Sequence, residues 1–165
     1  MRVEYINPFV ESAYNVLTET LGGIKVERGE LFLKNSTMKI MGVAALVGLA
    51  GDVEGRVMFD MTKETALNVA NTFGLAAGVI GAGQSFKALD DMAQSALTEL
   101  ANQITGQAVS KLQSQGFKFD LSPPVLFTGD NMEISNTLQV EALIVPMNMG
   151  KLGTIEINVV IRERV

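Results

Sequence analysis

The sequence predicts a single α+β domain with a mostly antiparallel sheet that long helices cover on one face. The chain has 165 residues, about the length of one domain, and 47% of them are hydrophobic, which is enough to fill a core. The expected elements run in the order helix, strands, helix, helix, strands. Consecutive hairpins in such an order favour antiparallel pairing, with the helices packed on the sheet. We therefore expect residues 1–165 to form one domain.

The first expected elements are a helix and an interrupted strand. Residues 8–21 carry apolar side chains at helical spacing, and Pro8 suits the first turn of a helix. Residues 24–33 alternate weakly between apolar and polar side chains. This pattern indicates a strand with a turn at Arg28 and Gly29.

A hairpin and a second helix follow. Residues 43–50 are almost entirely apolar, which is typical of a buried central strand, and residues 55–61 return as its antiparallel partner. Thr62 is suited to cap the next helix, which should end near Gly74. Residues 75–85 are rich in Gly and Ala, so we expect a mobile connection there.

The second half begins with the longest expected helix, residues 88–115, which Gly116 should end. A short strand is expected at residues 125–127. Two further strands, at residues 137–145 and 154–162, close the chain. The last of them alternates apolar and polar side chains most regularly.

The composition excludes several classes of function. The chain has no Cys and no His, which rules out Ser–His and Cys–His nucleophile pairs, disulfides and His-rich metal sites. Its net charge of −5 argues against binding of nucleic acid, which needs a basic face. The N-terminus lacks the apolar core of a signal peptide, so we expect a cytoplasmic protein. Residues 65–86 carry no charge, but their amides and glycines favour a buried helix and a loop over a membrane span.

The longest expected helix has two contrasting faces. An apolar stripe that should face the core consists of Leu89, Ala93, Ala96, Leu97, Leu100 and Ile104. Ser95, Glu99 and Asn102 lie together on the opposite side, at spacings that make them surface neighbours. Gly106 lies one turn further along this face, where it would let another backbone come close. An ordinary solvated helix surface has the same composition, so the pattern alone does not identify a site.

The residues on this face resemble a family signature. Ser95, Glu99 and Asn102, followed by a Pro pair at residues 123–124, resemble the Asp/Ser-x-x-x-Glu-x-x-Asn motif of the CheC, CheX and flagellar-switch phosphatases. The Gly-rich hairpin at residues 48–57 is similar to the same family, and the resemblance covers nearly the whole chain. The presence of one motif and the chain length are most similar to the CheX branch.

The resemblance implies dephosphorylation of the aspartyl-phosphate of a CheY-like response regulator. It implies that Asn102 positions the attacking water and that Glu99 docks to the active-site Lys of the regulator. Ser95, Thr98 and Gly106 lie beside this pair and are the candidate contacts to the regulator, although Ser95 and Thr98 could equally be solvated. No cofactor of its own is implied, because the regulator holds the Mg²⁺ that neutralises the phosphoryl group. The resemblance also implies a homodimer, and the long apolar strands at the C-terminal end could pair at their edges.

A short echo links the two halves of the chain. A helix that ends in Gly and continues into a Lys-containing extended segment is expected at residues 21–26 and again at residues 115–119. The echo indicates either a duplicated half or a chance similarity. Superposing the two segments places Tyr5 and Pro8 where the second half has its Glu and Asn. The first half would therefore lack the pair.

Two other functions remain open. The same helix face could hold a response regulator or another signalling partner without turnover, or the chain could be a structural dimer or adaptor whose motif is a remnant. Release of inorganic phosphate at sub-stoichiometric protein would distinguish these from an enzyme. Asp90 and Asp91 are expected in the acidic first turn of the long helix. A two-Asp metal site there is the alternative, but the sequence offers no third ligand, so we expect no metal site.

Overall fold

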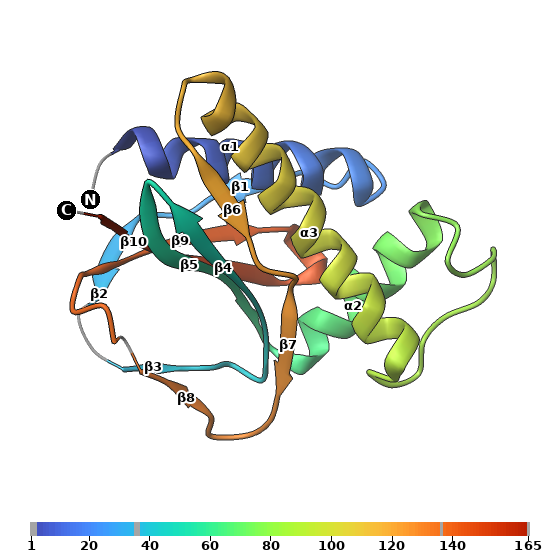
Figure 1. The fold of residues 1–165 in the computed structure, drawn as a ribbon. Helices are drawn as coiled ribbons and strands as arrows, with labels where there is room; N and C mark the ends of the chain where they lie inside the picture. The colour runs from blue at the N-terminus through green and yellow to red at the C-terminus, as the bar shows by residue number, and fades with distance from the viewer. Residues whose placement is uncertain (1–2, 35–36, 136, 165) are drawn as a thin grey trace.

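The computed structural model describes residues 3–34, 37–135 and 137–164, in which three α-helices pack on one face of an antiparallel sheet (Figure 1). The α+β class expected from the sequence is confirmed. The helices are α1 (Val3–Thr20), α2 (Lys63–Ala76), α3 (Asp91–Ser114) and the short 3-10 helix η1 (Gly150–Leu152). The strands are β1 (Glu27–Arg28), β2 (Phe32–Lys34), β3 (Met38–Lys39), β4 (Val43–Gly51), β5 (Val53–Met61), β6 (Phe119–Leu121), β7 (Val125–Thr128), β8 (Glu133–Ile134), β9 (Ala142–Asn148) and β10 (Thr154–Glu163).

The main sheet has the strand order β1-β9-β10-β5-β4-β6, with β2 also pairing with β9 and β7 also pairing with β4. The hairpins β4–β5 and β9–β10 meet through β5 and β10, which therefore occupy the centre. Because β9 and β10 each have partners on both sides, the expectation that the C-terminal strands offer a pairing edge is wrong. Among the described strands, the outer ones are β1, β2, β6 and β7.

The strand pairing repeats in the two halves of the chain. β1 and β2 pair with β9 in the same way that β6 and β7 pair with β4. Glu27 of β1 corresponds to Leu121 of β6, and Leu33 of β2 corresponds to Phe127 of β7, with the same difference in residue number in both pairs. The residues of β9 and β4 with which they pair also differ in residue number by one constant amount. This agreement in register favours a duplicated half over chance.

The first two expected elements differ from the structure in detail. Helix α1 begins at Val3, so Pro8 lies inside the helix and is buried there. A proline in this position removes one backbone hydrogen bond, and burial of its ring offsets part of that cost. The turn expected at Arg28 and Gly29 is a bulge, because Gly29 N–H donates to Pro146 O at 2.8 Å and β2 continues the pairing with β9.

The strand expected at residues 137–145 is also shifted along the chain. β9 begins at Ala142 and extends to Asn148, and Gln139 before it has a positive φ of 57°, which interrupts an extended strand. Strand β6 and the small β3–β8 pair were not expected. These strands have only two or three residues, too few to show an alternating pattern.

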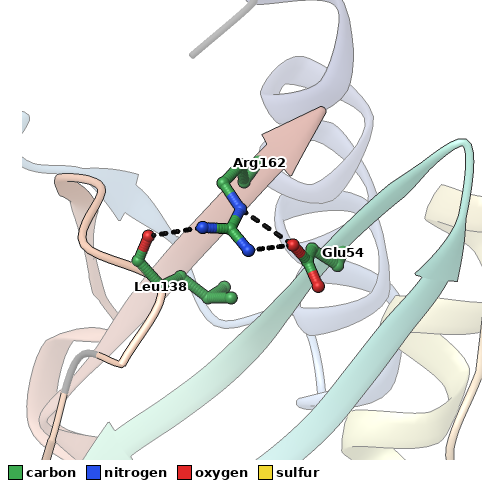
Figure 2. A network of polar contacts seen from close by, with 3 residues as sticks. All are labelled: Glu54, Leu138 and Arg162. Atoms are coloured by element: carbon green, nitrogen blue, oxygen red, sulfur yellow. Dashed lines mark hydrogen bonds and ion pairs between the residues drawn. The ribbon is translucent and has the colours of Figure 1, made fainter. Parts of the chain in front are cut away.

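A smaller core covers the face of the sheet that lies away from the helices. Its buried residues are Met38, Ile40, Ala44, Met58, Ala142, Ile144 and Val160. Two arginines hold the overlying segment on this face. Arg56 Nη1 donates to Ser135 O at 3.0 Å, and Arg162 Nη1 donates to Leu138 O at 3.3 Å. Arg162 also forms an ion pair with Glu54, its cross-strand neighbour on β5 (Figure 2).

The uncharged stretch of residues 65–86 forms most of α2 and the connection that follows it. Thr62 caps α2 as expected, with its Oγ1 accepting a hydrogen bond from Thr65 N–H at 3.1 Å. The connection returns to α3 at the side of the molecule (Figure 1) and is anchored at Phe86, whose N–H donates to the Asn71 side chain. In the described parts of the chain, no helix combines the length and the apolar character that crossing a membrane requires.

Candidate functional site

Helix α3 is fixed at its start and along its buried face. Asp90 precedes the helix and caps it, with Oδ1 accepting a hydrogen bond from Ala93 N–H at 2.9 Å. The buried face consists of Ala93, Ala96, Leu97, Leu100, Ala101, Ile104, Thr105, Ala108, Val109 and Leu112. Its alanines let the helix lie close to the sheet, and the void beneath it measures only about 10 Å³. The opposite face is therefore presented to solvent by a firmly packed helix.

This outer face carries the residues that the sequence singled out. Ser95, Glu99 and Asn102 are exposed, and Thr98 and Gly106 are half-buried at the flank and at the far end of the face. Residues three or four apart on a helix have Cβ atoms about 5–6 Å apart. The structure therefore places the Glu99 side chain between Ser95 and Asn102 on one continuous surface.

The polar contacts on this face differ among its members. Thr98 Oγ1 donates to Ser95 O at 2.9 Å, so its hydroxyl is already engaged with the helix backbone. Glu99 Oε1 accepts a long hydrogen bond of 3.4 Å from Gln103 Nε2, which leaves the carboxylate able to meet a cation. Within the described ranges, the Asn102 side-chain amide has no hydrogen-bond partner, so both its donor and its acceptor face solvent.

An open hollow of about 570 Å³ lies along α3 next to Asn102. It is lined by Asn102, Gln103, Gly106, Gln107, Ser110 and Lys111. At Gly106 an added Cβ would meet nothing within 4 Å, so the glycine lowers the floor of the hollow. Sequence reasoning missed Gln103, Gln107, Ser110 and Lys111. Helical spacing would have found them, because Gln103 and Ser110 lie three and four residues from Gly106, and Gln107 and Lys111 follow Gln103 at intervals of four.

The chemistry available here is the positioning of a polar molecule against a charged group. A primary amide can accept from and donate to one water, and a carboxylate beside it can bind a cation. Asp90 is occupied as the helix cap, in agreement with the expected acidic first turn. Across the residues that the structure describes, no group of three or more acidic side chains is arranged to hold a metal ion.

The first half offers no equivalent pair, but its corresponding residues are not those expected. Tyr5 and Pro8 are buried, and the Tyr5 ring packs edge-on against Phe117 at 5.1 Å between centroids, so neither matches an exposed position of α3. The buried positions of α1 and α3 coincide when Asn7 and Val10 are superposed on Glu99 and Asn102. Superposing Gly22 on Gly116 gave the wrong correspondence, because α3 extends further toward the strand that follows it than α1 does.

The fold and this helix face define a class of proteins. A CheC-like superfamily protein from Shewanella sp. PV-4 has a structure similar to this one, with a TM-score of 0.82, 26% identity, and coverage of 98% of this chain and 99% of that chain. The CheX family model, described as chemotaxis phosphatase CheX, matches residues 43–148. The chain belongs to the CheX family.

Two relatives place the chain within this family. The CheY-P phosphatase CheX of Thermotoga maritima is 26% identical over 136 residues, covering 82% of this chain and 83% of the relative. A chain of the CheX–CheY–BeF₃–Mg²⁺ complex from Borrelia burgdorferi is 40% identical, with a TM-score of 0.81 and coverage of 98% of this chain and all of that chain.

Proposed function

We propose that this chain is a phosphatase that hydrolyses the aspartyl-phosphate of a CheY-like response regulator, and that residues 1–165 act as one CheX-like domain. The observation that carries the proposal is the pairing of an exposed Glu99 with an unengaged Asn102 amide on a firmly packed helix. Membership of the family of the chemotaxis phosphatase CheX supports it, as does the 40% identity to a chain of the Borrelia burgdorferi CheX–CheY complex.

In this proposal Asn102 positions the attacking water. An acyl phosphate is already activated for hydrolysis, so the catalyst has to hold a water in line with the bond to be broken. The Asn102 amide can do this without a titrating base, in keeping with a chain that has no His and no Cys. The Mg²⁺ that neutralises the phosphoryl group belongs to the regulator, and the relative's complex contains CheY, BeF₃ and Mg²⁺ together.

Glu99 docks the regulator in this proposal. Its exposed carboxylate would pair with a Lys in the regulator's active site and so fix the position of α3. Ser95 and Thr98 flank it and contribute contacts, while Gly106 provides a low floor on which the regulator backbone can lie. The tightly packed buried face of α3 holds the backbone of these residues in place.

The same proposal includes a homodimer and a cytoplasmic location. It also includes that the protein binds neither nucleic acid nor a membrane. The outer strands support dimerisation, since β2 and the residue before it expose Leu31, Phe32 and Leu33, and β7 exposes Val125 and Phe127. Exposed apolar side chains on an unpaired strand edge favour pairing with another strand. The net charge of −5 is unfavourable for binding phosphate backbones.

The test is release of inorganic phosphate from a phosphorylated CheY-like regulator in the presence of Mg²⁺. The protein, at about one hundredth of the regulator concentration, should release many equivalents of phosphate. A parallel titration with the beryllofluoride-activated regulator should show binding to the activated form. If the protein binds the activated regulator but never accelerates phosphate loss, the chain is a non-catalytic binding module and the phosphatase proposal is wrong.

A further inference from the structure

The internal duplication extends to a second hollow on the protein surface. A depression of about 440 Å³ on α1 is lined by Val10, Glu11, Tyr14, Asn15, Arg28 and Met147. When the buried faces of the two helices are superposed, its four α1 residues fall on Asn102, Gln103, Gly106 and Gln107, which line the hollow on α3. The two hollows are thus corresponding parts of the two halves.

The α1 hollow corresponds in position to the hollow on α3 but is lined by different side chains. Val10 stands where α3 has the water-positioning Asn102, and Tyr14 stands where α3 has Gly106. With Met147 they provide an apolar lining, and Arg28 supplies a positive charge. This surface has no group to position a water against a phosphoryl group, but it can bind an apolar side chain that has an acidic neighbour.

The two hollows adjoin each other. Helices α1 and α3 pack together, and Lys111 Nζ lies 3.4 Å from Glu11 Oε2. Lys111 lines the hollow on α3 and Glu11 lines the hollow on α1, so this ion pair is the boundary between them. From Asn102 to Lys111 the helix rises only about 14 Å.

The size of a protein interface decides how many partners this surface can hold. A stable complex buries about 800 Å² on each partner, which corresponds to a patch of about 16 Å in radius. A patch of that size centred near Glu99 and Asn102 extends as far as the Lys111–Glu11 boundary, where the α1 hollow begins. Two regulators, one on each hollow, would overlap.

We infer that the response regulator bound at Glu99 and Asn102 also docks on the α1 hollow, where Tyr14 and Val10 receive an apolar side chain of the regulator and Arg28 faces an acidic one. The inference rests on the proposed function and adds a second anchor to it. It makes Tyr14 a positioning residue that governs affinity for the regulator, separately from the hydrolytic step.

The test is a comparison of steady-state kinetics for Tyr14→Ala, Tyr14→Phe and Met41→Ala. Tyr14 is 46% exposed and Met41, two residues before β4, is 40% exposed, so the two alanine variants remove similar exposed surfaces. Tyr14→Ala should raise KM about tenfold and leave kcat unchanged, because a buried tyrosine anchor contributes binding in both ground and transition states. Tyr14→Phe should retain most of the affinity, and Met41→Ala should match the wild type.

The outcomes separate this inference from the function on which it rests. An unchanged KM in Tyr14→Ala, with wild-type turnover intact, overturns the α1 anchor and leaves the phosphatase proposal in place. A wild type that does not accelerate phosphate release removes both. Melting curves of each variant confirm folding, and the mass of the complex with the beryllofluoride-activated regulator should correspond to one regulator per chain. Two regulators per chain would also overturn the inference.

Discussion

The Asn102 side chain can make hydrogen bonds in two directions at once, which is what the alignment of a single water requires. Asn102→Ala removes this amide from an exposed position, so the free energy of unfolding should change by no more than about 0.5 kcal/mol. Turnover should fall by roughly 10²–10³, by analogy with the loss of one positioned donor in a transition state. Phosphate-release rates and melting curves measured together check this.

Asn7→Ala is the matched control for this substitution, because Asn7 is an exposed amide on the corresponding helix α1. It should retain wild-type kcat. Binding of the beryllofluoride-activated regulator should be nearly unchanged in Asn102→Ala, since the amide acts on the water. Near-wild-type phosphate release by Asn102→Ala would refute the role assigned to this residue.

Glu99 differs from Asn102 because its contribution is electrostatic. Glu99→Gln keeps the size of the side chain and its position beside Gln103, but removes the charge that would meet the regulator's Lys. The substitution should weaken binding of the activated regulator by about tenfold at low salt. It should also flatten the salt dependence, because an exposed ion pair is screened at high ionic strength. Binding titrations at several salt concentrations measure both effects, and an unaltered salt dependence would contradict the docking role.

At the level of elements, strand β5 contains a buried acid, Asp60, whose pKa is shifted from its usual value. The pKa of Asp60 is raised to about 6, chiefly by burial and also by the charge of Glu156 on the neighbouring strand. Hydrogen bonds from the backbone N–H groups of Met41 and Met61, and the charge of Lys34, offset part of this rise. Since this value lies above the value near 4 in an unfolded chain, the folded protein binds the extra proton between about pH 4 and pH 6. The contribution of Asp60 to stability is therefore full below this window and is lost as the pH rises through it.

Asp60→Asn should abolish this pH dependence and increase stability at neutral pH. The amide oxygen of Asn can still accept from Met41 N–H, which is bonded to Asp60 Oδ1 at 3.0 Å, and no charge is buried. The free energy of unfolding at pH 7 should rise by about 1–3 kcal/mol. Urea titrations at pH 4.5 and pH 7 measure the difference, with the exposed Asp120→Asn as control. A variant less stable than the wild type at pH 7 would show that Asp60 is stabilising in its charged form.

At the scale of the whole molecule, the duplicated architecture leaves two outer edges, one in each half. Strand β2 and its preceding residue expose Leu31, Phe32 and Leu33 in succession, whereas the corresponding strand β7 exposes Val125 and Phe127. We expect the proposed homodimer to form through β2, because three neighbouring apolar side chains offer the larger contact.

Leu33→Lys should therefore convert the dimer into a monomer, since two like charges would be brought together at a symmetric interface. Phe127→Lys on β7 is the matched control and should remain dimeric. Sedimentation equilibrium over a range of concentrations gives the mass of each variant. A dimer that survives Leu33→Lys would exclude β2 as the interface.

Much of the second half could be predicted from the sequence because its signals are local. The 3.6-residue pattern of α3 predicted its buried face, and the three-residue spacing of Glu99 and Asn102 predicted that both would lie together on the exposed face. The alternation of residues 154–162 predicted strand β10 nearly to its observed bounds. Periodicity within one element is set by backbone geometry and does not depend on which other elements surround it.

The sequence by itself determined the α+β class, the main helices and hairpins, and the exposed Glu–Asn face of α3. Only the tertiary structure decided that β1 and β2 cross to the other half to pair with β9, that Tyr5 is buried while Asn7 is exposed, and that Glu11 meets Lys111 between two hollows. The physical reason is the range of the interactions. Helix faces and hairpin turns follow from neighbouring residues, whereas strand order and helix contacts depend on burying apolar surface from distant parts of the chain.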